Sequence, residues 1–199
     1  MIPFNYPVEP HQRRHGPIGY VVPESFRPWL RDEFAFRCVY CLRREAWYPG
    51  RTSFEIDHLN PVSTFPELSL VYDNLVYSCD VCNSIRGSRE IPDPSVKLLV
   101  GAVVVDVDGH IRGTSSDAKR IIRILGLDDA EFVAYRMRWI KIVALARMHD
   151  PSLFQQLMGF PTELPDLSSL RPPQGNTCPD GISVSYLRLR ERGELAATY

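Results

Sequence analysis

Two pairs of cysteines, each pair separated by two residues, constrain the fold of this chain most strongly. The four cysteines are Cys38, Cys41, Cys79 and Cys82. A Cys-x2-Cys pair places two sulfurs on one tight turn, and two such pairs complete the tetrahedral shell of a zinc ion. Because four protein ligands leave no coordination position for a substrate, the sequence predicts a structural zinc site.

Other uses of these cysteines agree less well with the sequence. A disulfide framework is typical of secreted proteins, and the first residues have neither the basic start nor the apolar stretch of a secretory signal. A redox dithiol usually involves a single Cys-x2-Cys pair. Residues 42–78, between the pairs, form a longer insert than common zinc ribbons have, so we look there for function. Cys178 has no partner motif and is predicted to be a lone thiol.

The insert begins with a predicted strand that ends in two chemically useful side chains. Residues 53–58 alternate apolar and polar side chains, and Pro61 stops the strand soon after Asp57 and His58. Neighbouring side chains on a strand point to opposite faces, so these two share a function only if the strand ends in a cleft. Glu55 is expected to face outward and not to bind a metal.

A second strand and a helix complete the predicted unit. Residues 73–78 favour a short strand that leads directly into the second cysteine pair. Residues 80–86 suit a helix, and Gly87 suits its C-cap. The predicted order is therefore strand, loop, strand and helix, with the zinc ion clamping the helix to what precedes it.

Four motifs follow one another within residues 34–90: Cys-x2-Cys, Glu-Ile-Asp-His-Leu-Asn-Pro, Asp-Asn-Leu-Val and Cys-x2-Cys-Asn-x2-Arg-Gly. In this order they resemble the motifs of the HNH endonucleases of the ββα-metal (His-Me finger) fold. The resemblance implies that His58 is the first H, Asn74 the N, and Asn83 the last position, where many members carry His. Asn is a weaker metal ligand than imidazole, which bears on metal affinity and on the preferred ion. A phage junction-resolving endonuclease of the same fold family also has Asn directly after its second cysteine pair.

Phosphodiester hydrolysis gives each of these residues a task. It needs an activated water, neutralised charge on the phosphoryl oxygens and a stabilised leaving oxygen. His58 suits the first task, because a neutral imidazole accepts a proton near neutral pH. The oxygens of Asp57 and Asn83 suit the other two, as hard ligands for Mg²⁺ or Mn²⁺. By the resemblance, Asn74 holds the loop that carries His58.

Arg86 and Arg89, at the end of the predicted helix and just beyond it, are candidate phosphate-binding residues. The other assignments have plainer alternatives. His58 would otherwise be a partly exposed hydrogen-bonding residue, Asn74 a turn residue, and Asn83 a surface residue of the helix.

Charge supports a nucleic-acid partner only indirectly. The 23 basic and 24 acidic residues give a formal charge of −1, so no global field attracts polyanions. Arginine greatly outnumbers lysine, and it binds phosphate in a bidentate way that lysine cannot. A basic face near the metal site and a simple compositional bias explain this excess equally well. The arginines that suggest such a face are Arg13, Arg14, Arg27, Arg31, Arg37, Arg43, Arg44 and Arg51.

Beyond the core, the sequence predicts a hairpin and two helices. Residues 98–100 and 103–105 lead to Asp108-Gly109, a two-residue turn signal, and Ile111 lies on the return strand.

The first of these helices ends at Gly126, and Ser116 or Asp117 can cap its start. Asp128 can cap the longer second helix, which continues to Asp150. Its apolar side chains recur at helical spacing, which predicts a face packed on the core. They are Phe132, Tyr135, Trp139, Ile142, Val143 and Ala146. Trp47 and Tyr48, beside Arg43 and Arg44, could stack on bases or brace the cysteine turns, and bracing is the expected role.

We therefore expect an α+β fold in four parts. An N-terminal arm (residues 1–33) precedes the ββα-metal core (34–90), and a hairpin and helical extension (91–160) precedes a proline-rich tail (161–199). The extension resembles that of stand-alone bacterial HNH proteins, several of which are associated with anti-phage defence.

The sequence predicts a metal-dependent HNH endonuclease that cleaves DNA, and the extension suggests the effector of a defence system. RNA cleavage would use the same residues, and a non-catalytic zinc ribbon that binds nucleic acid or protein is the other reading. No DNA-reading motif is present, so we expect a regulatory partner such as an ATPase. No apolar run suits a membrane span, and a cytoplasmic protein is expected.

Overall fold

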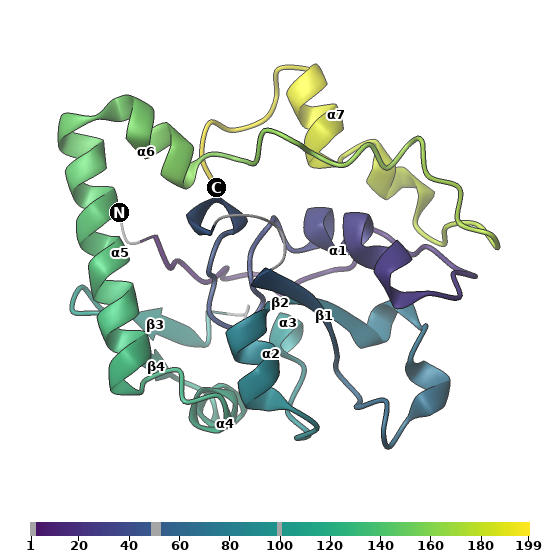
Figure 1. Cartoon of the computed structure of the whole chain (residues 1–199), viewed down its shortest axis with the longest axis horizontal. Coiled ribbons are helices and arrows are strands. Elements are labelled where there is room, and N and C mark those ends of the chain that lie inside the picture. Colours follow the sequence, from purple (N-terminus) through teal and green to yellow (C-terminus); the bar gives the residue numbers. More distant parts are fainter. Residues whose placement is uncertain (1–2, 49–52, 99–100) are drawn as a thin grey trace.

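The computed structural model describes residues 3–48, 53–98 and 101–199. Figure 1 shows a two-stranded sheet near the centre, with α2 beside it and the long α5 along one side. In chain order the helices and strands are α1 (Arg27–Glu33), β1 (Phe54–His58), β2 (Leu75–Cys79), α2 (Asp80–Arg86), α3 (Pro94–Lys97), β3 (Val103–Val105), β4 (Ile111–Gly113), α4 (Ser116–Ile124), α5 (Ala130–His149), α6 (Pro151–Met158) and α7 (Tyr186–Glu191).

The ββα core has the predicted order. β1 and β2 are antiparallel, from Phe54 opposite Cys79 to His58 opposite Leu75. All of β2 is buried, because α1 also packs on it. In β1 the Glu55 side chain is exposed, as predicted. The fold class is therefore confirmed as a mixed α and β structure with an HNH-type ββα core.

Both ends of α2 are fixed by local signals. Cys79 is the N-cap, and its sulfur accepts a hydrogen bond from the Cys82 backbone N–H at 3.5 Å. Gly87 ends the helix with φ of 55°, a conformation that costs glycine little. The cysteine pair therefore begins the helix that carries Asn83.

The predicted hairpin exists, but its turn has three residues and not two. Residues 107–109 form the loop, since the Asp106 N–H bonds to the His110 carbonyl at 2.8 Å. Within it, the Gly109 N–H bonds to the Asp106 carbonyl at 3.0 Å, and Gly109, with φ of 85°, is the third loop residue, which favours glycine. Leu99 and Val100, which were predicted to lead into the hairpin, lie outside the described residues.

The two predicted helices form, with different caps. Ser115, and not Ser116 or Asp117, caps α4, because its Oγ accepts a hydrogen bond from the Ala118 N–H at 3.1 Å. The residue before α4 is extended, which places the cap one position earlier than expected.

The cap of α5 is also displaced by one residue. Asp129 is the N-cap, and the Asp128 carboxylate instead accepts a hydrogen bond from the Ile111 N–H of β4 at 2.8 Å. The helix ends at His149, one residue before the predicted end. Asp128 therefore joins the helical extension to the hairpin.

The α5 helix packs on the segment that carries the ββα core, as predicted. The Trp139 ring stacks on Trp47 with centroids 4.4 Å apart and planes at 9°. The Trp47 indole N–H also donates to the Leu157 carbonyl of α6 at 2.9 Å. Trp47 is buried, so this ring braces the core.

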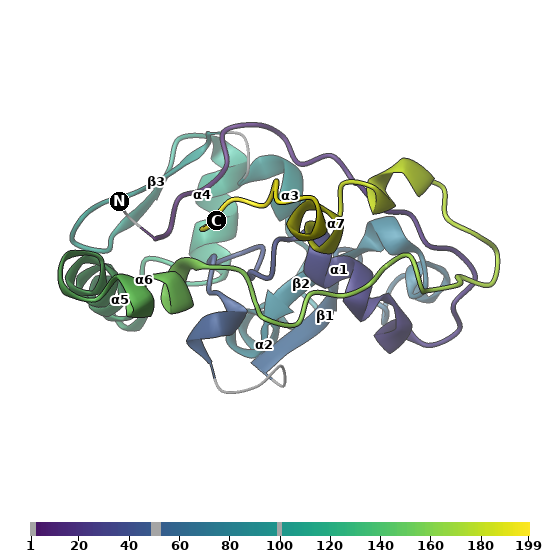
Figure 2. The same ribbon diagram turned by 90° about the horizontal axis from the view of Figure 1, so that it is seen from above.

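One apolar core joins the parts of the chain, from Phe4 to Leu167. In Figure 2 the N-terminal and C-terminal segments both pass close to α1, and a β-bridge pairs Pro17 with Asn176. The proline-rich stretches have few regular elements, but α1 lies inside the predicted arm and α7 inside the predicted tail. The part boundaries stay a prediction. None of the helices in the described ranges has the length and hydrophobicity of a membrane span.

The arginines of the first 51 residues do not form the exposed basic face that their number suggested. Those that are described are buried or half-buried. Arg31 forms a bidentate ion pair with Glu45, with both distances 2.8 Å. Arg14 binds Asp32, whereas Arg51 lies outside the described residues. These guanidinium groups therefore hold segments of the chain together.

Candidate functional site: a cysteine cluster and a polar pocket

The four cysteines of the two pairs converge in the core. All are buried, and their sulfurs lie within 4.8 Å of one another. The Cys41 and Cys79 sulfurs are 3.8 Å apart. Zn–S bonds of about 2.3 Å in a tetrahedron place sulfurs roughly 3.8 Å apart, whereas a disulfide requires about 2 Å. The cluster therefore fits a four-coordinate metal and excludes disulfides between these residues. Cys178 lies outside it.

The first cysteine pair is shaped by an unusual backbone. Leu42 has φ of 57°, and the Cys38 N–H donates to the Arg43 carbonyl at 2.9 Å. Between the cysteines, the Val39 N–H donates to the Tyr77 carbonyl of β2 at 2.9 Å. The turn is therefore attached to the sheet that carries the second pair.

A polar pocket of about 290 Å³ lies between the end of β1, the loop after it and α2. It brings together four predicted site residues, Asp57, His58, Asn83 and Arg86. Asn74 and Arg89 do not line it. The cleft that the alternation of β1 required is present, because the strand ends at this pocket.

His58 is half-buried and is oriented by the loop opposite. Its Nε2 lies 3.1 Å from the Ser69 backbone carbonyl. A carbonyl oxygen can only accept, so this contact assigns the ring proton to Nε2. In the neutral ring, Nδ1 is then the atom able to accept a proton.

Asn74 is buried and fixes the same loop. Its Oδ1 accepts hydrogen bonds from the Asn60 backbone N–H at 2.7 Å and from the Asn60 side chain at 3.0 Å. Its Nδ2 donates to the Asn60 and Leu68 carbonyls, both at 3.1 Å. Asn74 thus joins the start of the loop to the segment just before Ser69, which orients His58.

Asp57 is only 4% exposed and is surrounded by donors. Its Oδ1 accepts from Arg86 at 2.5 Å and from the His58 backbone N–H at 2.7 Å, while Oδ2 accepts from the Tyr40 hydroxyl at 2.6 Å. Burial raises the pKa of the Asp57 carboxyl, and the Arg86 charge and the Tyr40 hydrogen bond oppose that rise. With about four lone pairs on a carboxylate, Oδ2 keeps one for a further partner.

Asn83 lies on α2 and is half-buried. Its Nδ2 donates to the Glu55 carboxylate of β1. This contact leaves the Asn83 Oδ1 without a partner in the described residues, beside the pocket. A free carboxamide oxygen and one carboxylate lone pair fit a hard divalent ion such as Mg²⁺ or Mn²⁺.

The two predicted phosphate-binding arginines differ in placement. Arg86 is 1% exposed and binds both Asp57 and the Leu59 carbonyl, the latter at 2.7 Å. Arg89 is exposed, and its Nε donates to the Arg86 carbonyl at 3.1 Å. Only Arg89 therefore presents its guanidinium to solvent.

Three contributors to this site were not predicted from the sequence. Tyr40 lies inside the first cysteine pair, and Ser69 contributes only its backbone carbonyl. Glu55 was expected to face outward, and its contact with Asn83 was not predicted. Of the three, only Glu55 could have been found from the sequence, because the alternation of β1 places Glu55 on the same face as the site residue Asp57.

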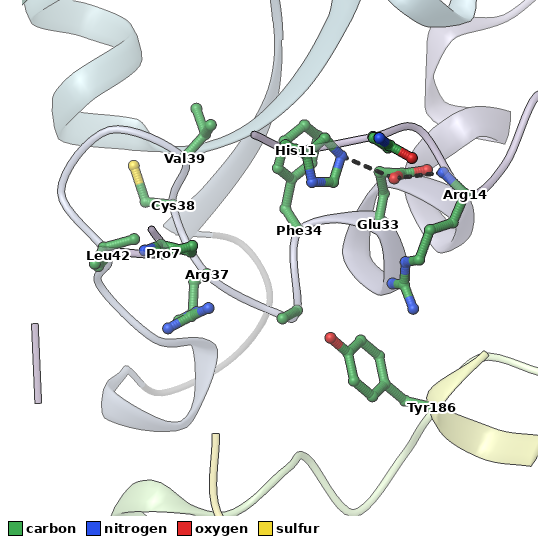
Figure 3. A pocket seen from close by; sticks show the side chains of 12 residues that line it. Pro7, His11, Arg14, Glu33, Phe34, Arg37, Cys38, Val39, Leu42 and Tyr186 are labelled. Atoms are coloured by element: carbon green, nitrogen blue, oxygen red, sulfur yellow. Dashed lines mark hydrogen bonds and ion pairs between the residues drawn. The ribbon is translucent and has the colours of Figure 1, made fainter. Parts of the chain in front are cut away.

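A second cavity, of about 240 Å³, was also not predicted (Figure 3). It lies beside the first cysteine turn, and Arg37 and Tyr186 approach it from opposite sides. Its acidic group, Glu33, already bonds to the His11 ring at 2.9 Å and to the Arg14 backbone N–H at 2.9 Å. This cluster joins the N-terminal segment to α1.

Comparison with known proteins points to the same region of the chain. A sequence model of the HNH endonuclease family matches residues 38–89, the range that holds the cysteine cluster and the polar pocket. The chain is also similar to the Septu protein PtuB of Bacillus thuringiensis, with 27% identity over 109 residues. The match covers 50% of this chain and 39% of PtuB, so the chain spans about two fifths of that relative's length.

Proposed function

We propose, from the premise that residues 38–89 form an HNH nuclease domain, that this protein is a metal-dependent endonuclease that hydrolyses phosphodiester bonds in DNA. The observation that carries the proposal is the shared pocket of Asp57, His58 and Asn83. Their chemistry differs, and each type suits one requirement of phosphodiester hydrolysis.

His58 acts as the general base. Its Nε2–H is held by the Ser69 carbonyl, so Nδ1 accepts the proton of the attacking water. Asn74 holds the loop that carries this carbonyl and is therefore a positioning residue.

Asp57 and Asn83 are the residues that would hold a catalytic Mg²⁺ or Mn²⁺, with Oδ2 and Oδ1 as the available oxygens. When bound, such an ion neutralises phosphoryl charge and stabilises the leaving oxygen. Tyr40 and Glu55 keep the two ligands oriented. The cysteine cluster would hold a structural Zn²⁺, which would fix α2, and therefore Asn83, relative to β1.

Similarity to PtuB, and the resemblance of the extension to bacterial HNH proteins associated with anti-phage defence, support a role as the effector of a defence system. The chain has no DNA-reading motif such as a helix-turn-helix. A regulatory subunit, for which an ATPase is our candidate, would then restrain and direct cleavage.

Two alternatives predict different results. A non-catalytic zinc ribbon has no use for His58 beside Asn83, and an RNA-cleaving HNH nuclease uses the same residues on another substrate. The test incubates the zinc-loaded protein with supercoiled plasmid, linear duplex, single-stranded DNA or RNA, in Mg²⁺, Mn²⁺ or EDTA.

We expect cleavage of DNA that is lost in EDTA and in His58→Ala. His110→Ala is the matched control, because His110 is an exposed histidine at the hairpin turn. Cleavage of RNA alone would show that the substrate is RNA and not DNA. Equal activity of both variants, or binding without cleavage by a folded, metal-loaded protein with its partner added, would contradict the proposal.

A further inference from the structure

The exposed face of α4 carries cations that the nuclease domain does not account for. Lys119, Arg120 and Arg123 are all exposed, whereas the apolar side of the helix is buried. At 100° per residue these three side chains cover an arc of about 100° on the helix. They therefore point to one side of the molecule.

Two of the four nearby carboxylates are paired with cations outside this face. Asp117 pairs with Lys97 at 3.1 Å, and Asp128 lies 3.9 Å from the buried Arg136 guanidinium. Glu90 and Asp129 remain, against the three cations of α4 and the exposed Arg89. The surface thus keeps an excess of positive charge in a chain whose formal charge is −1.

This surface continues from the polar pocket. Gly87 and Ser88 line the pocket, and Arg89 follows directly. The Arg120 guanidinium then contacts the Glu90 carbonyl at 3.5 Å, which joins α4 to the same segment.

We propose that Lys119, Arg120 and Arg123, with Arg89, form a cationic track that binds the phosphate backbone of duplex DNA beside the site of cleavage. The inference rests on the proposed function for the position of the cut, but the binding itself does not require cleavage. Such contacts carry no base information, and they place the duplex relative to the pocket.

The test measures binding of a fluorescent 30-base-pair duplex to the zinc-loaded His58→Ala protein between 50 and 300 mM salt. The variant Lys119→Gln/Arg120→Gln/Arg123→Gln removes three α4 cations. The control removes three exposed cations of α5 that form no ion pair with the described residues, through Arg138→Gln, Lys141→Gln and Arg147→Gln. Both variants lose the same net charge.

Each phosphate contact contributes about 0.9 to the slope of log K against log salt concentration, so the α4 variant should lower the slope by about 2.7. Affinity should fall on the order of 100-fold at 0.1 M salt. The α5 control should change the slope and the affinity by no more than a small factor. Circular dichroism should show that the α4 variant and the α5 control are both folded. Equal effects of the two variants, or none, would overturn the track.

The two proposals fail separately. A reduced slope in the α4 variant, without cleavage by the metal-loaded wild type with its partner added, keeps the track and rejects the nuclease. Cleavage with an unchanged slope does the reverse.

Discussion

The Asp57 carboxylate at the strand end of β1 forms a buried ion pair with Arg86, the last residue of α2, at 2.5 Å. Both side chains are nearly inaccessible to solvent, so their charges compensate each other in a medium that hydrates neither. The pair also joins the two elements that carry His58 and Asn83. It therefore has a structural role whatever else Asp57 binds.

Arg86→Leu should leave a buried carboxylate without its cation and cost about 3–5 kcal/mol of unfolding free energy. Asp57→Asn/Arg86→Leu should cost less, because no net charge then stays buried. Urea denaturation of the wild type, the single variants and the double variant measures the coupling. Additive losses would show that the two groups do not act as a pair.

Cys82→Ser should remove one sulfur of the metal cluster, release zinc and unfold at least the ββα core, since the binding free energy of such a site is folding free energy. Cys178→Ser is the matched control, because this thiol lies outside the cluster. Metal content and near-ultraviolet circular dichroism report the result. Retention of one zinc per chain and of the native spectrum in Cys82→Ser would contradict the assignment.

Asn74→Ala should leave the Asn60 N–H and the Leu68 carbonyl without their partners and cost about 2–4 kcal/mol of stability. The Ser69 carbonyl that orients the His58 ring lies on this loop. The cleavage rate should therefore also fall, roughly 100-fold. Single-turnover cleavage at saturating protein separates this rate from binding. Normal turnover by a destabilised variant would leave Asn74 with a structural role alone.

Glu55→Ala should free the Asn83 amide to rotate and weaken Mn²⁺ binding by about 10–100-fold. Glu55→Gln keeps an acceptor for the Asn83 Nδ2 and should retain more of the affinity. Electron paramagnetic resonance of free Mn²⁺ measures both, and Glu67→Ala is the control for loss of an exposed carboxylate. If Gln and Ala weaken binding equally, the Glu55 charge and not its hydrogen bond to Asn83 would matter.

Glu33 should make the fold sensitive to acid. Burial alone would raise its pKa, but hydrogen bonds from His11 and the Arg14 backbone, and the nearby histidine charges, lower it from 4.5 to about 2. A folded-state pKa below the unfolded value adds stability above pH 4.5 that is lost as the pH falls toward 2. This contribution should decline by about 2 kcal/mol between pH 6 and pH 3.

The measurement compares the wild type with Glu33→Gln in urea at each pH. Acid also weakens zinc binding in both proteins, so the difference between them isolates Glu33. The gap in unfolding free energy should narrow as the pH falls. A gap that stays constant from pH 6 to pH 3 would reject the assigned pKa.

Local sequence rules were enough to predict the ββα core and the convergence of the four cysteines. A Cys-x2-Cys spacing, the alternation in residues 53–58, and Gly87 after a short helix each act over a few residues. The resemblance to HNH endonucleases, which these motifs carry, implied that Asp57, His58 and Asn83 share one site, and all three line one pocket in the structure. The caps that the same rules predicted for α4 and α5 are each one residue away from the observed caps, because adjacent Ser and Asp residues offer equivalent local signals.

The sequence by itself determined the order of the strands and helix, the cysteine cluster and, through the family resemblance, the polar side chains Asp57, His58 and Asn83 of the pocket. Only the tertiary structure decided that Arg86 pairs with Asp57, that Glu55 holds Asn83, and that a backbone carbonyl orients His58. It also decided that the described arginines of the first 51 residues are buried or half-buried and bind groups of the chain itself. The physical reason is that these contacts join residues far apart in the chain through groups that leave no periodic pattern, so they exist only once packing has placed the partners together.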